Sequence, residues 1–278
     1  METCKKIGEL LCSLREKNPL IHNITNYVTV NDCANITLAI GASPVMADDI
    51  NEVKDMVSLA SSLILNIGTL NKRTVESMIE AGKRANELNI PIILDPVGAG
   101  ATKYRTENAN RIIDEIKLSV VRGNISEIKT LYGLETQTKG VDASEPISSS
   151  RDELTEIKEI ARNFAKKFNT ICAITGATDI ITDGKTIYSV TNGHKIMSKI
   201  TGTGCMCTSL IGSYLGAADN YLLAALSGIV SMGIAGEKAF EKMNKNDEGT
   251  GSFKTYLIDS IYKLSKEEII QRGKVYEE

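Results

Sequence analysis

The chain has 278 residues, 42% of them hydrophobic and 24% charged, a composition typical of a soluble globular protein. Its formal net charge of −3 gives no reason to expect a nucleic acid or an acidic membrane surface as a partner. Two histidines argue against a His-rich metal site, and because the charged stretch 1–18 lacks a signal-peptide pattern, the six cysteines are expected to be reduced thiols in the cytoplasm.

Helical periodicity and short apolar strands alternate along most of the chain. Helix 3–17 ends before Pro19, and the apolar pair Leu20-Ile21 leads into a polar cluster at 22–26. The alternation continues in chain order as helix 29–41, strand 44–47, helix 50–60, strand 63–67, helix 71–88, strand 90–94, helix 105–117, strand 118–121, helix 125–132, a polar loop at 134–150, helix 152–168 and strand 170–174. This alternation predicts an α/β fold, with a mainly parallel central sheet covered by helices on both faces.

The pattern changes after this last strand. Residues 179–182 and 186–190, joined by Asp183-Gly184, are typical of a hairpin. Three helices follow, at 204–218, 221–243 and 252–264. A charged tail from Lys266 is expected to be partly disordered. No domain boundary is visible, so the prediction is one domain over residues 1–278.

Two neighbouring stretches, 200–218 and 220–236, carry no charge and approach the length that spans a membrane. Both are rich in glycine, serine, threonine or alanine, and only a short turn at Asp219-Asn220 connects them. We therefore predict two helices buried in a large core and no membrane-spanning hairpin. The motifs of P-loop enzymes and of Rossmann dehydrogenases are both missing.

The glycine-rich stretch Thr201–Cys205 opens the first of these helices. Two glycines leave the backbone N–H groups of a helix start uncovered, and with the helix dipole behind them these groups favour a phosphate. Cys205 would lie where the anion is held, in surroundings that lower the pKa of a thiol. The alternative interpretation is a glycine-rich turn with a buried cysteine.

Several polar residues follow other predicted strands, at the edge of a parallel sheet where ligands bind. Asp95 is either a carboxylate for a hydrated Mg²⁺ or the cap of the next turn. Asn124 and Glu127 share a helix face and could hold a metal or its waters with Asp95, while Arg122 could clamp a phosphate. Glu127 could also be only a favourable charge at a helix start. A carboxylate–metal cluster, an arginine and an anion hole are together the parts of phosphoryl transfer.

Eight motifs, in the same order and at similar spacing, resemble those of the hydroxyethylthiazole kinase family, over roughly residues 7–265. They are Pro19–Val28, Gly41–Met46, Leu65–Leu70, Leu94–Gly98, Arg122–Glu127, Asn192–His194, Thr201–Cys205 and Gly251–Phe253. The resemblance implies a ribokinase-like α/β fold. It also implies phosphorylation of 4-methyl-5-(2-hydroxyethyl)thiazole by ATP with Mg²⁺, a step that salvages the thiazole half of thiamine.

The resemblance also implies roles for residues at the matched positions. These are Cys205 near the acceptor hydroxyl, where most ribokinase-like enzymes have a general-base Asp; Met46, Gly202 and Asn26 for the thiazole; Arg122, Thr175, Asn124 and Gly204 for the nucleotide; and Asp95 and Glu127 for Mg²⁺, chiefly through water. The family is trimeric with active sites between subunits. We therefore expect a homotrimer, in which Met46 is free to serve a neighbour's site.

One departure is Ala177-Thr178 before Asp179, where relatives commonly have Glu and an apolar residue, and it leaves the nucleotide side open in detail. One alternative function is a kinase of the same fold for hydroxymethylpyrimidine, pyridoxal or a sugar. The other is a non-catalytic sensor of nucleotide or thiazole. Cys205 is interpreted as a base, although a role that only orients the alcohol stays open. Both histidines, His22 and His194, are expected to make structural hydrogen bonds.

Overall fold

The structure, a computed structural model, describes residues 2–134 and 151–278, so the predicted loop at 134–150 lies outside it apart from Leu134. The helices are α1 (Glu2–Lys17), α2 (Val30–Ile40), α3 (Val53–Leu59), α4 (Lys72–Glu87), α5 (Lys103–Glu115), α6 (Ile125–Tyr132), α7 (Arg151–Phe168), α8 (Thr203–Leu215), α9 (Tyr221–Lys245), α10 (Thr250–Tyr262) and α11 (Lys266–Arg272), with a 3₁₀ helix at Lys195–Lys199. The strands are β1 (Leu20–Ile24), β2 (Ser43–Val45), β3 (Ser62–Asn66), β4 (Ile92–Asp95), β5 (Val120–Gly123), β6 (Ile171–Ile174), β7 (Asp179–Thr182), β8 (Ile187–Val190) and β9 (Val275–Glu277).

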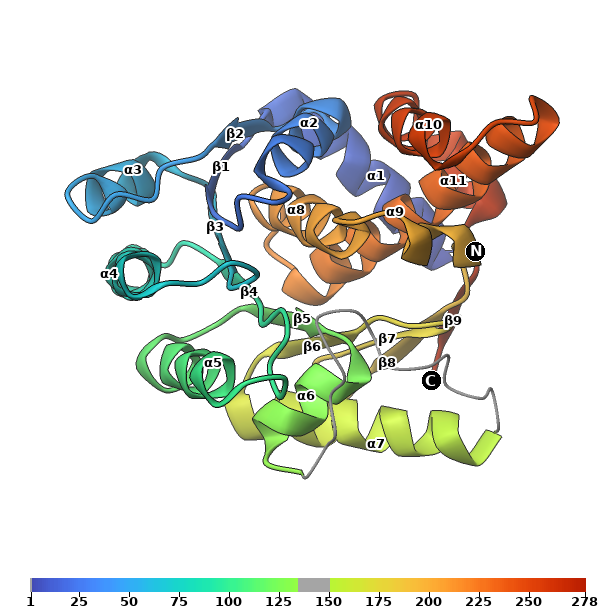
Figure 1. Ribbon diagram of the computed structural model, residues 1–278. Helices are drawn as coiled ribbons and strands as arrows, with labels where there is room; N and C mark the ends of the chain where they lie inside the picture. The colour runs from blue at the N-terminus through green and yellow to red at the C-terminus, as the bar shows by residue number, and fades with distance from the viewer. Residues whose placement is uncertain (1, 135–150) are drawn as a thin grey trace.

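The strands form one nine-stranded sheet in the order β2-β1-β3-β4-β5-β6-β7-β8-β9 (Figure 1). Strands β1 to β6 pair in parallel, and β6 to β9 pair antiparallel. Helices α3 to α7 cover one face, and α1, α2 and α8 to α11 cover the other. The predicted α/β architecture and the β7–β8 hairpin are therefore confirmed.

Strand β3 shows why the central strands are continuously apolar. All five of its residues are buried, and they alternate between the two faces. Ile64 packs into the hydrophobic cluster under α1, α2, α8, α9 and α10. Leu63 and Leu65 pack into the second cluster, which lies under α3 to α7. The sheet is thus enclosed between two apolar layers, and only the ends of its strands are left for polar chemistry.

Local signals fix several helix ends. Asn71 and Thr74 form a capping box at the start of α4, in which each side chain bonds the other residue's backbone N–H. At the end of α2, Gly41 has a φ of 107°, a left-handed conformation that favours glycine. The end predicted from this glycine is confirmed, and the chain turns there into β2.

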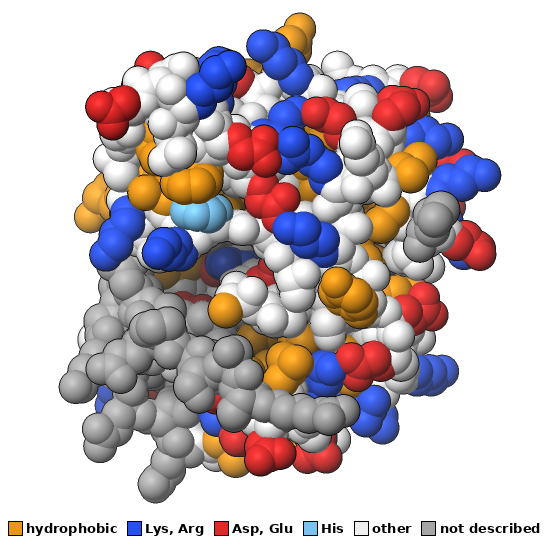
Figure 2. Space-filling view, turned by 90° about the vertical axis from the view of Figure 1, so that its right-hand side faces the viewer, with side chains coloured by type: hydrophobic (Ala, Val, Ile, Leu, Met, Phe, Trp, Pro, Cys, Tyr) orange, Lys and Arg blue, Asp and Glu red, His pale blue; other side chains and the backbone are white. Residues whose placement is uncertain are grey.

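The two uncharged stretches form α8 and α9, and both are core helices as predicted. Residues 206–215 of α8 are all buried. Helix α9 is long and apolar enough to cross a membrane, but 78% of its apolar window is buried inside the fold. On the face of the molecule in Figure 2, acidic and basic side chains are interspersed, without a large field of one sign.

The expectation that the tail from Lys266 is partly disordered is wrong. Ser265 and Glu268 form a capping box at the start of α11, and Ile269 is fully buried. After α11, strand β9 pairs antiparallel with β8 at the sheet edge. The tail carries many charges and only one fully buried apolar residue in α11, so its sequence pattern suggested disorder and did not reveal the short strand.

Helix α11 also joins the two ends of the described chain, because it packs against α1 (Figure 1). The thiol of Cys4 donates to the carbonyl of Gly273 at 3.8 Å. From the other end of α1, Arg15 Nη1 donates to the carbonyl of Leu264 at 2.8 Å. The N-terminal helix is therefore held by residues more than two hundred positions away.

Candidate active site

The polar residues singled out in the sequence meet at the carboxyl ends of the parallel strands. Asp95 ends β4 and pairs with Asn66, which ends β3 and was not among the predicted site residues. Arg122 is in β5, and Thr175, just after β6, donates its backbone N–H to the carbonyl of Gly123 at 2.9 Å. The start of α8 comes to the same place. The prediction that these strand ends form one cluster is confirmed.

Cys205 lies in the first turn of α8, with two side-chain amides directed at its sulfur. The Nδ2 atoms of Asn26 and Asn66 each donate to Cys205 Sγ at 3.3 Å. Burial raises the pKa of the Cys205 thiol, and the nearby charge of Asp95 raises it further. The sequence-based expectation of a lowered pKa is therefore wrong. The helix start and the amide donors do favour the thiolate, but desolvation and the carboxylate outweigh them.

Asp95 is fully buried in the middle of the cluster. Its Oδ2 accepts hydrogen bonds from Asn66 Nδ2 at 2.9 Å and Thr208 Oγ1 at 2.8 Å, and Arg122 Nη1 is 3.6 Å away. Burial raises the pKa of this carboxyl, while Arg122 opposes the shift. Its Oδ1 accepts no hydrogen bond from any residue in the described ranges.

This unpartnered oxygen fits a hydrated Mg²⁺, which binds proteins through one or two carboxylates together with water and substrate phosphates. Within residues 2–134 and 151–278, no group of three or more His, Cys, Asp or Glu side chains is placed to hold a metal ion. The donor set therefore suits an ion that keeps most of its water and does not form an all-protein cage.

Arg122 is directed at the start of α8. Its Nη2 donates to Thr175 Oγ1 at 2.6 Å, and only 14% of its side chain is exposed. A Cβ atom placed on Gly204 would lie 2.8 Å from Arg122 Nη1, so glycine at this position leaves room for the guanidinium. Arg122, Thr175 and Gly204 are thus brought together, with a positive charge at the amino end of a helix.

Asn124 and Glu127 form the capping box of α6, which is the structural alternative considered for Glu127. Glu127 Oε2 accepts from the N–H of Asn124 and Oε1 from the N–H of Gly98, both at 2.8 Å. Burial and the neighbouring charge of Asp95 raise the pKa of Glu127 to about 7. Both side chains thus serve the local fold, and their roles toward metal and nucleotide stay predictions.

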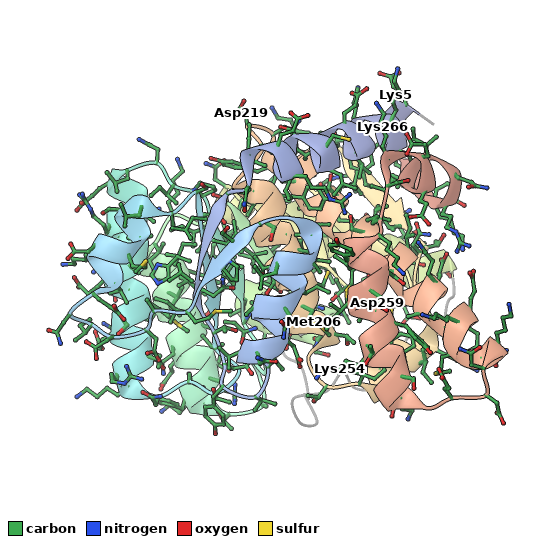
Figure 3. All side chains as sticks on the ribbon, turned by 90° about the horizontal axis from the view of Figure 1, so that it is seen from above. Lys5, Met206, Asp219, Lys254, Asp259 and Lys266 are labelled. Atoms are coloured by element: carbon green, nitrogen blue, oxygen red, sulfur yellow. The ribbon has the colours of Figure 1, made fainter. Side chains whose placement is uncertain are left out.

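Gly202 and Met46 lie on the other side of the cluster. Gly202 has a φ of 87° and packs against Thr29 and Asp32. Asp32 in turn accepts from Lys254 Nζ at 2.7 Å, which ties α2 to α10 beside this turn (Figure 3). Met46 directly follows the edge strand β2 and is partly exposed. No hydrogen bond or ion pair connects Met46 with the other candidates in the described part of the chain.

Comparison with known proteins identifies the family of this chain. A family model, described as the hydroxyethylthiazole kinase family, matches residues 11–267. The chain belongs to the hydroxyethylthiazole kinase family. It is 62% identical over 279 residues to a hydroxyethylthiazole kinase of Clostridium tetani, with 99% of each chain covered. It is 57% identical to one of Alkaliphilus oremlandii, with both chains fully covered.

Solved structures agree with this membership. A hydroxyethylthiazole kinase from Pyrococcus horikoshii OT3 superposes with a TM-score of 0.88 at 40% identity, over 99% of both chains. A pyridoxal kinase from Staphylococcus aureus has a TM-score of 0.57 at 16% identity, over 78% of this chain and 87% of the other. The second likeness concerns the fold alone. The chain is a kinase of this family, and the predicted ribokinase-like fold is confirmed.

Two residues of the cluster were missed in the sequence. Asn66 is the only polar side chain in the predicted strand 63–67, a signal that was available but not used. Thr208 lies one helical turn after Gly204, in a stretch interpreted only as core. Both donate to Asp95 Oδ2. Contacts of this kind connect different elements, so spacing along the chain does not reveal them.

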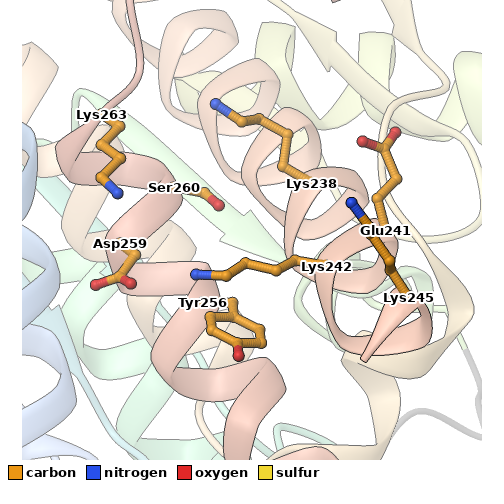
Figure 4. A pocket seen from close by; sticks show the side chains of 8 residues that line it. All are labelled: Lys238, Glu241, Lys242, Lys245, Tyr256, Asp259, Ser260 and Lys263. Carbon is orange, nitrogen blue, oxygen red and sulfur yellow. The ribbon is translucent and has the colours of Figure 1, made fainter. Parts of the chain in front are cut away.

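A groove of about 340 Å³ between α9 and α10 lies apart from this cluster (Figure 4). The ammonium group of Lys242 lies 3.8 Å from the centroid of the Tyr256 ring. Lys238 and Glu241 form ion pairs with residues of α11. Its lining includes none of the candidate residues, so we place the active site at the strand ends. As predicted, both histidines make structural hydrogen bonds: His22 Nε2 bonds the carbonyl of Ala47, and His194 Nδ1 accepts from the backbone N–H of Ile196.

Proposed function

We propose that the chain transfers the γ-phosphoryl group of ATP to the primary alcohol of 4-methyl-5-(2-hydroxyethyl)thiazole, with Mg²⁺, in thiamine salvage. The observation that carries the proposal is the meeting of Cys205, Arg122 and Asp95 at the start of α8, in a member of this family. Relatives that share 57% to 62% of their residues with this chain are named hydroxyethylthiazole kinases.

The nucleotide side of the proposed site is the cationic one. Arg122 and Thr175 meet phosphate oxygens, because a guanidinium fork can bond two oxygens at once. The backbone N–H of Gly204 adds a donor that has the dipole of α8 behind it. Asn124 would contribute to nucleotide binding from the start of α6, which its side chain caps.

Asp95 would hold Mg²⁺ with Oδ1, the oxygen that accepts no hydrogen bond from the described residues. When bound, the ion neutralises negative charge on the phosphates. Both oxygens of Glu127 accept backbone N–H groups, so Glu127 would act on the ion through water. The guanidinium group of Arg122 compensates the buried negative charge of Asp95.

The acceptor side consists of Cys205, Asn26, Gly202 and Met46. Cys205 would take the alcohol proton during phosphoryl transfer. In a loose transition state this proton leaves late, so a group held within hydrogen-bond reach suffices as base. The amides of Asn26 and Asn66 stabilise the sulfur as an acceptor. We also propose that residues 1–278 act as one cytoplasmic kinase domain with a small-molecule substrate and neither nucleic acid nor membrane as partner.

On a panel of thiazole, pyrimidine, pyridoxal and ribose alcohols, hydroxyethylthiazole is expected to give the highest kcat/KM. The reason is the site itself, which presents a cysteine at the acceptor where most ribokinase-like enzymes have an aspartate. ADP release with ATP and Mg²⁺ measures the whole panel. Faster turnover of pyridoxal or ribose would contradict the substrate assignment, and no turnover of any alcohol would favour the sensor alternative.

We expect the protein to form a homotrimer with active sites between subunits. Met46 follows an edge strand and has no polar link to the rest of the cluster among the residues described, which suits a contribution to a neighbour's site. Light scattering combined with activity across a dilution series is the measurement. A trimer that loses activity as it dissociates is the expected result, and a fully active monomer would disprove shared sites.

A further inference from the structure

Asn66 makes four side-chain hydrogen bonds, the full capacity of a primary amide. Its Oδ1 accepts from the backbone N–H of Gly68 at 2.9 Å and from Asn26 Nδ2 at 3.0 Å. Its Nδ2 donates to Asp95 Oδ2 at 2.9 Å and to Cys205 Sγ at 3.3 Å. Because every donor and acceptor is used, the amide has one orientation. A flipped amide would set its oxygen against the Asp95 carboxylate.

We propose that Asn66 is a positioning residue, which holds the sulfur of Cys205 at a fixed distance from the Asp95 carboxylate. The inference rests on the proposed function, since it assigns Asn66 to the phosphoryl-transfer site. Asn66 is 2% exposed and ends β3, which lies between β1 and β4. Its amide therefore cannot shift unless the sheet itself moves. One rigid amide thus fixes the distance between the acceptor side and the metal side.

The contacts of Asp95 and Cys205 show what Asn66 controls on each side. On Asp95, the bonds from Asn66 and Thr208 both end on Oδ2, which leaves Oδ1 as the oxygen without a hydrogen bond from the described residues. On Cys205, the two amides occupy the sulfur as donors, so a substrate hydroxyl can become the third donor. Loss of Asn66 would disturb both sides, with no direct contact to either substrate required.

Asn66→Asp is the sharpest variant, because it keeps the shape and the two acceptor contacts and removes the NH₂ donor. If the new carboxyl group is protonated, its single O–H donates to Asp95, so no donor remains for Cys205. We expect kcat to fall about tenfold to a hundredfold, the effect of losing one hydrogen bond to a charged group. The KM values for ATP and the thiazole should stay close to wild type, because Asn66 is proposed to touch neither.

A second readout does not depend on catalysis. All six cysteines lie in the described ranges, and only Cys12 and Cys205 are not buried. In a Cys12→Ser background, alkylation by iodoacetamide therefore reports on Cys205. The titratable and charged groups that face this thiol are Asp95 on β4, Arg122 on β5 and the buried thiol of Cys33 on α2. With Asn66→Asp, the pH midpoint of the alkylation rate should move upward, because the thiolate loses a donor.

Asn23→Asp is the matched control. Asn23 is also 2% exposed and lies on the neighbouring strand β1, but its amide donates to the carbonyl of Ile21. This variant should leave the alkylation midpoint of Cys205 unchanged. If Asn66→Asp does not fold, as judged by circular dichroism, Asn66→Ala takes its place, with the same expected direction in both readouts.

The outcomes separate this inference from the proposed function. A wild-type kcat and a wild-type alkylation profile in a folded Asn66 variant would overturn the role of Asn66 and leave the kinase proposal standing. An equal shift in the Asn23→Asp control would mean that any buried carboxylate acts this way, and would also overturn it. If the wild-type protein does not phosphorylate the thiazole, the proposed function fails, and the alkylation profile alone then decides on Asn66.

Discussion

Replacing Cys205 with alanine is expected to lower kcat by about 10²–10⁴, the usual effect of removing a general base. The sulfur lies at the first turn of α8 and accepts from two amides, an arrangement that suits a group receiving a third hydrogen from the alcohol. Cys205→Asp, which restores the carboxylate usual in ribokinase-like enzymes, should keep much of the activity. Cys205→Ser should behave like alanine, because a hydroxyl does not ionise near neutral pH.

The measurement is kcat for the three variants at saturating ATP, together with the pH profile of the wild-type enzyme. Burial and Asp95 raise the pKa of the thiol, so the thiolate is scarce at neutral pH and its share grows as the pH rises. For a base, kcat should therefore rise with pH past the ordinary thiol pKa of about 8.5. A serine variant at near wild-type rate, with a flat profile, would show that Cys205 only orients the alcohol.

The second large effect is expected at Arg122. Arg122→Ala should weaken the use of ATP by about one to two decades, because a charge-assisted contact to phosphate is lost. It should also lower the free energy of unfolding by about 3–5 kcal/mol, since Asp95 is left buried without its cation. Steady-state kinetics and thermal unfolding measure the two effects separately.

Arg73→Ala is the control for this prediction. Arg73 forms an ion pair with Asp48 at 2.9 Å, but both side chains are about half exposed. Its loss should change the free energy of unfolding by no more than about 1 kcal/mol and leave ATP use intact. If Arg122→Ala abolished thiazole binding and left the KM for ATP unchanged, Arg122 would belong to the acceptor side.

The sheet and most helices could be predicted because each strand carries its own signal. In β3 and β4, short apolar runs end in a polar residue, and helical periodicity follows each of them. The same rule located Asp95, Arg122 and Thr175 at one edge of the sheet. The prediction failed where the sequence pattern is weak, as in the charged segment that forms α11 and β9, where one buried isoleucine is the main anchor.

The electrostatics of the site were harder to predict than its composition. A helix start suggested a lowered thiol pKa for Cys205, but the depth of burial and the distance to Asp95 depend on the tertiary structure. In the same way, the spacing of Asn124 and Glu127 fits both a metal site and a capping box, and only the folded structure shows the capping box. Hydrogen bonds between strands, such as those of Asn66, have no signature along the chain.

The pairing of α1 with α11 has a consequence for the order of folding. The apolar stripe of α1, which includes Ile7, Leu11 and Leu14, is buried in the finished protein. The bonds that hold the helix join Cys4 to Gly273 and Arg15 to Leu264, so they need chain segments more than two hundred residues apart. Contacts of such separation form slowly, because a long loop must close first. The parallel strands can pair earlier. Until the C-terminal segment with α11 has packed, α1 exposes an apolar surface of the kind that chaperones recognise.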